Sequence, residues 1–308
     1  MDIFSAPHFR DDEAARKFLE GILWPDGPVC PHCGVIGHAY ETKRAGVYRC
    51  AEKECRKDFT VTMKTVMERS HIALHKWLMA FHLVTSSKKG ISAHQLHRTL
   101  GITYRSAWFM EHRIREAMRA GGLSPMGGSG GTVEADETFI GRLEGSVKRR
   151  GHGHKNAVLS LIDRNSGQVR SFHVEGTSAA DIVPIIKANV AKETAMMTDE
   201  GGHYFTLGDH FASHESVSHK ADEYARGKVH TNTVENFYSV FKRGMKGVYQ
   251  QCSEKHLHRY LAEFDFRYSN RVKLGYDDTM RAERALFGIK GKRLTYQGPD
   301  SHIASQEI

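Results

Sequence analysis

Four cysteines in one short stretch constrain the fold of this chain more than any other feature of its sequence. Cys30 and Cys33 have two residues between them, Cys50 and Cys55 have four, and 16 residues separate the two pairs. Two short loops joined by a hairpin can place four thiolates tetrahedrally, each about 2.3 Å from a zinc ion. Binding the ion would fold a segment too small to bury its own core. The spacing therefore predicts a closed, structural zinc ribbon over residues 27–62.

Two other interpretations of this segment stay open from the sequence. The four cysteines could be buried free thiols, and His32 or His38 could replace a thiolate, although four thiolates are the simpler set. Cys252 stands alone and is expected to be a partly buried thiol. Cysteines confined in this way are not the disulfide framework of a secreted protein, so we expect a reduced, cytoplasmic protein.

The charge balance favours a polyanionic partner. The chain has 308 residues, with 44 Lys and Arg against 36 Asp and Glu, and a formal net charge of +8. A positive field attracts polyanions such as nucleic acids, although the balance alone does not choose among them. No apolar run approaches the roughly 20 residues that a membrane-spanning helix needs. Acidic residues also interrupt the N-terminus, where a signal peptide would have an apolar core.

The N-terminal half is predicted to be helical outside the cysteine segment. Apolar side chains recur with helical spacing over 11–24 and 72–88. The next segment resembles a helix-turn-helix, with a short helix over 92–100, a glycine turn and a longer helix over 104–119. An ordinary helical hairpin is the alternative. The longer helix could enter a DNA major groove, and the residues expected on its outward faces are Tyr104, Arg105, Ser106, His112 and Arg113. Phosphate contacts are expected from Lys88, Lys89, Arg98, Arg105 and Arg113.

A glycine-rich linker at 121–131 precedes a region with a different pattern. The β-rich segments lie at 132–140, 156–163 and 168–175, followed by a helix over 178–192 and a short apolar strand over 194–198. A loop-rich stretch and two helices, near 233–243 and 254–269, complete the pattern. Strands mixed with helices in this order predict an α/β fold with a mixed sheet.

Acidic side chains occur at three places where their chemistry is informative. Glu134 and Asp136 share one face of the first predicted strand, whereas Glu137 points to the other. Asp199 ends the short apolar strand, and Glu235 lies near a helix start that Asn232 or Thr233 could cap. Each acid alone could be an ordinary turn or capping residue. Together they fit a site for hard divalent cations such as Mg²⁺, which prefer carboxylate oxygens.

Five segments in this order resemble the transposases of bacterial insertion sequences, specifically the insertion-sequence fifteen-ninety-five (ISXO2-like) family. They are the cysteine ribbon, KKGISAHQLHRTLGITYRSAWFMEHRIREAM, EADETFIGR, MMTDEG and HTNTVENFYSVFKRGMKGVY with KHLHRYLAEFDFRYSNR, and the resemblance covers roughly residues 10–290. The resemblance implies a ribonuclease-H-like catalytic domain with a DDE triad. By match to the family's motifs, the triad is Asp136, Asp199 and Glu235.

The resemblance also implies a mechanism, cofactors and partners. Two Mg²⁺ (or Mn²⁺) ions held by the triad would support cleavage at the element's terminal inverted repeats and joining of the 3′-OH ends to target DNA. Because two DNA ends are joined in one event, we expect at least a homodimer on DNA, in the bacterial cytoplasm at the nucleoid. The predicted parts are an N-terminal helix (1–26), the zinc ribbon (27–62), the helix-turn-helix region (70–120), the linker (121–131), the catalytic domain (132–290) and a tail (291–308).

Basic residues follow two of the three acids. Lys148, Arg149 and Arg150 come after the first catalytic strand, and Lys242, Arg243 and Lys246 come after Glu235. Next to a site that acts on DNA they would contact phosphates, although a solvated surface is the plain alternative for each group. His230 is expected to be structural or near phosphate rather than a metal ligand. Competing functions are a non-catalytic zinc-ribbon regulator, a domesticated transposase, and a nuclease that cuts without joining.

Overall fold

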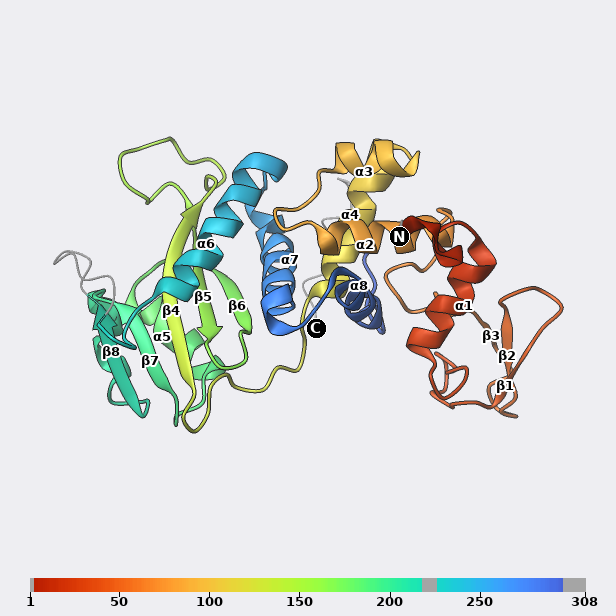
Figure 1. The fold of residues 1–308 in the computed structure, drawn as a ribbon, viewed down its shortest axis with the longest axis horizontal. Helices are drawn as coiled ribbons and strands as arrows, with labels where there is room; N and C mark the ends of the chain where they lie inside the picture. The colour runs from red at the N-terminus through yellow and green to blue at the C-terminus, as the bar shows by residue number, and fades with distance from the viewer. Residues whose placement is uncertain (1–2, 218–225, 296–308) are drawn as a thin grey trace. The chain divides into compact units, whose positions relative to one another are not determined.

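A computed structural model describes residues 3–217 and 226–295 of the chain, and these residues form two compact units (Figure 1). The helical unit contains the chain up to Ser86, Ser92–Met118 and the segment from Asp278 onward. The sheet unit contains Ser87–Ile91 and Arg119–Asp277. The chain therefore leaves the helical unit and returns to it. The predicted tail lies mostly outside the described residues.

Within the described residues the helical unit contains five α-helices, and some of their ends carry local capping signals. Asp11 caps the first helix by accepting from the Ala14 N–H, and Ser92 caps the third by accepting from the Gln95 N–H. Gly101, with φ of 59°, ends that helix in the left-handed region that glycine tolerates. The helices are α1 (Asp12–Leu23), α2 (Leu74–Ser86), α3 (Ala93–Leu100), α4 (Tyr104–Met118) and α8 (Asp278–Phe287).

The α8 helix was not predicted as a separate element, and the structure groups it with the N-terminal helices instead of with residues 132–277. Arg281 on α8 is 6% exposed, and its guanidinium donates to the Thr85 carbonyl of α2 at 3.2 Å. Contacts of this kind join segments almost 200 residues apart, which local sequence patterns do not report.

The cysteine segment forms a small antiparallel sheet in the order β1–β2–β3. Its strands are β1 (Ala39–Glu41), β2 (Tyr48–Cys50) and β3 (Asp58–Phe59). Phe59 is fully buried and packs with Trp24 and Tyr48 in an aromatic cluster. This cluster and the four cysteines make up the small core of the ribbon.

The sheet unit contains a five-stranded mixed sheet in the order β6–β5–β4–β7–β8. Strands β4, β5 and β6 are antiparallel neighbours, whereas β7 and β8 add to β4 in parallel. The strands are β4 (Thr132–Ile140), β5 (Asn156–Asp163), β6 (Val169–Val174), β7 (Ala195–Asp199) and β8 (Ser213–Val217). The edge strand β8 was expected to be loop, because its sequence Ser-His-Glu-Ser-Val has no clear apolar alternation.

Two different sets of helices cover the two faces of this sheet (Figure 1). Helix α5 (Ala179–Asn189) and the 3₁₀ segment Gly202–Leu207 pack on the face that carries Val133, Ala135 and Leu159. Helices α6 (Asn232–Gly244) and α7 (Leu257–Ser269) pack on the face that carries Val158 and Ile162. A π-helical turn, Met245–Tyr249, continues from α6. The central strand β4 is therefore covered on both sides.

The predicted linker is partly built into the sheet unit. Met126 is 4% exposed, its N–H donates to the Asn189 carbonyl at 2.8 Å, and its carbonyl accepts from the Ala191 N–H at 2.9 Å. The long segment of the sheet unit begins at Arg119, just before the predicted linker. Within the described residues, none of the helices has the length and apolar content to cross a membrane.

Candidate functional site

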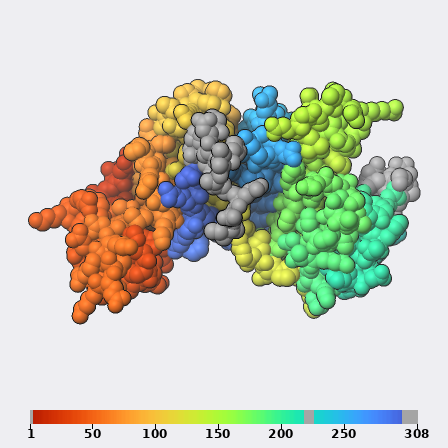
Figure 2. All heavy atoms as spheres, turned by 180° about the vertical axis from the view of Figure 1, so that it is seen from behind, coloured from red at the N-terminus to blue at the C-terminus, as the bar shows by residue number. Residues whose placement is uncertain are grey.

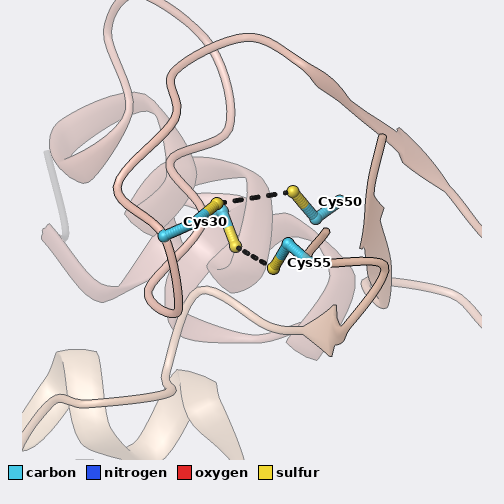
Figure 3. A group of neighbouring side chains, drawn as sticks. Cys30, Cys50 and Cys55 are labelled. Carbon is cyan, nitrogen blue, oxygen red and sulfur yellow. Dashed lines mark hydrogen bonds between the residues drawn. The ribbon is translucent and has the colours of Figure 1, made fainter. Parts of the chain in front are cut away.

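The four cysteines of the ribbon lie close together, and Figure 3 labels three of them, Cys30, Cys50 and Cys55. All four sulfur atoms lie within 4.8 Å of one another, with 3.8 Å between Cys30 and Cys55 and 3.6 Å between Cys33 and Cys50. A tetrahedral zinc site with Zn–S bonds of about 2.3 Å has sulfur atoms about 3.8 Å apart. The sulfur cluster therefore has the dimensions of a four-thiolate zinc site.

The two histidines that could have competed as ligands have other partners. The Nδ1 atom of His38 lies 2.7 Å from Glu52 Oε1, and the Nε2 atom of His32 lies 3.4 Å from the Asp58 carbonyl. Burial opposes ionisation of Cys30, but the N–H groups of Cys33 and His32 and the neighbouring cysteine side chains lower the pKa of this thiol to about 7, whereas burial raises the pKa of Cys50 to about 12. A thiol that ionises readily favours metal binding, since thiolate is the ligand form.

The three predicted catalytic acids lie on the elements that the sequence assigned to them. Asp136 is on the central strand β4, Asp199 ends the neighbouring strand β7, and Glu235 is in the first turn of α6. Strands β4 and β7 are parallel, with Glu134 opposite Met197, so continuing this register by two residues sets Asp136 opposite Asp199. Both side chains then belong to the face that α6 covers.

The charges of these acids act on one another. Burial, together with the nearby carboxylates of Glu137, Asp199 and Glu235, raises the pKa of Asp136 to about 8. One backbone N–H, that of Glu137, partly offsets this by donating to Asp136 Oδ1 at 2.7 Å. Acids that raise one another's pKa are a feature of functional sites, where a bound cation can neutralise their negative charge.

The acid group is less tightly gathered than the cysteines. Among residues 3–217 and 226–295, only the four cysteines form a set of potential ligands that all lie within 4.8 Å of one another. A pair of metal ions about 3.5–4 Å apart is held by carboxylates spread around both ions, which does not require that spacing. The assignment of Asp136, Asp199 and Glu235 as metal ligands remains a prediction.

Glu137 points away from this group, as the strand alternation predicted. Its carboxylate accepts a hydrogen bond from the Tyr204 hydroxyl and lies 3.2 Å from His203 Nε2, on the face covered by α5. Burial raises the pKa of Glu137. The Glu137 side chain therefore lies on the side of β4 opposite to Asp136, next to the segment that follows Asp199.

Glu134 is the residue whose importance the sequence did not reveal. It is completely buried, and its carboxylate binds the start of α6 together with Arg164. Neither Asn232 nor Thr233 caps α6 as predicted, because both residues lie inside the helix. Its N-cap residue is Thr231, whose side chain makes no capping bond. The Thr231 hydroxyl instead donates to Glu235 Oε1 at 2.8 Å. Strand alternation placed Glu134 on the correct face but did not identify its partners.

Two further contacts connect α6 to the central strand. The Tyr238 hydroxyl donates to the Asp136 carbonyl, and it is also 3.3 Å from the Val158 carbonyl. Lys242 lies two turns beyond Glu235, and its amine is close enough to Asp136 for the two charges to interact. Burial lowers the pKa of Lys242, and the attraction of Asp136 opposes this.

The other predicted phosphate contacts in the sheet unit are exposed. Lys148, Arg149 and Arg150 lie in the connection between β4 and β5, which projects from the unit (yellow-green in Figure 2). Arg243 and Lys246 are exposed beyond Glu235. Lys88 and Lys89 are exposed as well, in the short segment Ser87–Ile91.

The residues of α3 and α4 that were predicted to face DNA are only partly exposed. Arg98, Tyr104 and Arg105 are exposed on α3 and α4. The prediction that His112 faces outward is wrong, because this side chain is 1% exposed and stacks edge-on against Trp108. Arg113 is half-buried, and its guanidinium donates to the carbonyls of Leu294 and Glu68 at 3.1 and 3.4 Å. Arg113 therefore has a structural role in the helical unit.

His230 belongs to the Glu134 group. Its Nδ1 atom lies 2.9 Å from the Arg164 guanidinium and 3.3 Å from Glu134 Oε1. This placement agrees with the expectation that His230 is structural.

Residues 10–58 match the transposase zinc-ribbon domain, and residues 129–269 match the ISXO2-like transposase domain. A relative from Halobacterium salinarum, described as an uncharacterized protein in transposable element ISH50, is 28% identical over 279 residues, which cover 84% of this chain and 91% of the relative.

A chain in the cryo-EM structure of the simian T-cell lymphotropic virus intasome in complex with PP2A regulatory subunit B56 gamma is a distant structural match. Its TM-score is 0.29 at 13% identity, over 55% of this chain and 63% of that chain. The two domain matches and the relative in a transposable element carry the assignment. The assignment is a transposase zinc-ribbon domain followed by an ISXO2-like transposase domain.

Proposed function

We propose that this protein is a metal-dependent DNA transposase that cleaves the ends of its insertion sequence and joins the resulting 3′-OH ends to target DNA. The observation that carries the proposal is the group formed by Asp136, Asp199 and Glu235. These acids come from two neighbouring strands and a helix on the same face of the sheet, and the charges of Asp199 and Glu235 both act on Asp136.

The topology of the sheet supports the same proposal. Three antiparallel strands followed by two parallel ones, in the order β6–β5–β4–β7–β8, match what is expected of a ribonuclease-H-like domain. In such a domain the first acid lies on the central strand and the second on its parallel neighbour, which are the positions of Asp136 and Asp199.

The carboxylate group fits divalent cations with oxygen ligands. Asp136, Asp199 and Glu235 would hold Mg²⁺ or Mn²⁺, because these hard cations prefer carboxylates to nitrogen or sulfur. When bound, such a pair of ions activates an attacking water or 3′-hydroxyl and stabilises the leaving oxygen of a phosphodiester. Lys242, on the same face of α6, would bind a phosphate next to the scissile bond.

The remaining parts of the chain would bind DNA. We assign phosphate contacts to the exposed basic residues of both units, and the four cysteines to a structural zinc ion that folds the ribbon. Joining two ends requires two active sites in one complex, so the active species is at least a dimer on DNA. The exposed residues assigned to phosphate contacts are Lys88, Lys89, Arg98, Arg105, Lys148, Arg149, Arg150, Arg243 and Lys246.

The test is strand cleavage and joining with duplexes that carry the terminal sequences flanking the gene, in Mg²⁺. We expect the wild type to cut and join, and Asp136→Asn to bind the same duplexes without cutting. Asp181→Asn is the matched control, since Asp181 is a capping acid of α5 that accepts from Ser178. Binding without cleavage by the wild type would indicate a DNA-binding regulator, and cleavage without joining would indicate a nuclease.

A further inference from the structure

A glutamate with no exposed surface lies two residues before Asp136 on the same strand. Glu134 is 0% exposed, although glutamate is rarely buried unless its charge is paired. None of the chemistry proposed above uses this side chain. Its partners show why the charge is tolerated in the interior.

Glu134 supplies the N-terminal cap of α6 from another element of the fold. Its Oε2 atom accepts from the backbone N–H groups of Thr233 and Val234, each at 2.9 Å. Its Oε1 atom accepts from the Thr233 hydroxyl at 2.7 Å. The first N–H groups of a helix have no partner within the helix, and a carboxylate there also interacts favourably with the helix dipole.

Arg164 completes the arrangement and balances the charge. Its Nε donates to Glu134 Oε1 at 2.6 Å, and its other nitrogens donate to the carbonyls of Lys228 and His230, at 2.6 and 2.5 Å. The same ion pair therefore holds both the start of α6 and the segment that leads into it.

The bonds also exclude Glu134 as a metal ligand. A carboxylate has about four acceptor positions, and Glu134 already receives four hydrogen bonds, two on each oxygen. No acceptor position is left for a cation, in contrast to the role proposed for Asp136.

We propose that Glu134 is a positioning residue that places Glu235 beside Asp136, an inference that rests on the proposed function. Glu235 directly follows Val234, one of the two residues whose N–H groups Glu134 holds. One carboxylate on the central strand thus fixes the first turn of the helix that carries the third acid. Without it, the helix would remain attached through its apolar face but would lose the contact that defines the position of its first turn.

The test uses Glu134→Gln and measures Mn²⁺ binding by electron paramagnetic resonance in the absence of DNA, together with kcat for strand transfer. The glutamine amide has the same shape as the carboxylate, but its NH₂ group cannot accept hydrogen bonds. Two of the four donors around Glu134 would therefore lose their acceptor. We expect Mn²⁺ affinity to fall by about 10- to 100-fold, as for other residues that orient metal ligands. We expect kcat to fall by about 100-fold, because small misplacements at a reacting centre have effects of this size.

Glu263→Gln is the matched control. Glu263 is also 0% exposed and paired with an arginine, Arg267, at 2.6 Å, but it is on α7. A merely structural role for Glu134 predicts that both variants lose stability and that the folded fraction of each binds Mn²⁺ like the wild type. That result would overturn the inference, as would equal losses of Mn²⁺ affinity in both variants.

A milder variant keeps the inference testable if Glu134→Gln does not fold. Thr233→Ala removes one of the four hydrogen bonds and retains the backbone N–H, so we expect Mn²⁺ affinity to fall by about 2- to 10-fold. Unchanged affinity in this variant would refute the inference. Failure of the proposed function would look different, because the wild type itself would then neither bind Mn²⁺ at Asp136 nor join DNA ends.

Discussion

Binding of a divalent cation near neutral pH should release almost one proton, and Asp136 should be its source. Burial raises the pKa of Asp136 to about 8, and the neighbouring carboxylates contribute to the shift. A carboxyl group with this pKa is about 90% protonated at pH 7 and about 10% protonated at pH 9. Because a cation binds the carboxylate form, binding displaces the proton. The expected release is therefore about 0.9 proton at pH 7 and about 0.1 at pH 9.

Calorimetric titration of Mn²⁺ into the DNA-free protein, in buffers with different enthalpies of ionisation, measures this number directly. Below pH 8 the apparent affinity should also rise about tenfold for each pH unit. Asp136→Asn has no carboxyl group at this position, so its proton release should be close to zero at either pH. Release of less than about 0.2 proton by the wild type at pH 7, or the same release by the variant, would refute the reasoning.

The same pKa predicts how stability depends on pH in the metal-free protein. The pKa of folded Asp136 lies above its ordinary value of 3.8, so the contribution of this group to stability is complete below about pH 4 and is lost as pH rises to about 8. The limiting slope is about 1.4 kcal/mol for each pH unit. Urea unfolding should therefore show Asp136→Asn becoming more stable relative to the wild type between pH 5 and pH 8. A constant difference across this range would contradict the assignment.

Three further predictions concern the other parts of the chain. Cys50→Ser, or removal of zinc by a chelator, should unfold the ribbon and abolish stoichiometric zinc in metal analysis while leaving the circular dichroism of the sheet unit. Gly244→Ala should lower the free energy of unfolding by about 1–3 kcal/mol, because a Cβ there would overlap the Phe264 ring, whereas Gly247→Ala has open space and should be tolerated. Arg105→Ala should weaken DNA binding and reduce the salt dependence of log K by about 0.9, and an unchanged slope would exclude a phosphate contact.

Local patterns predicted most of the elements and the positions of the acids. The strands at 132–140 and 156–163 have the predicted bounds, and the alternation along β4 correctly assigned Glu134 and Asp136 to one face and Glu137 to the other. This succeeded because strand and helix periodicities depend on neighbouring residues alone. The spacing of the cysteines likewise reported a local arrangement, which the structure confirms as a cluster.

The sequence by itself determined the cysteine cluster, most of the strands and helices and the location of the acids, since each is encoded within a few residues. Only the tertiary structure decided that α8 joins the N-terminal helices, that Arg113 is held by carbonyls, and that Glu134 caps α6. The hydrogen bonds between Glu134 and Thr233 join residues 99 positions apart. Such contacts form only after the sheet has brought distant segments together. The residues next to a carboxylate in the sequence do not indicate which helix it will bind, so the sequence could not predict this contact.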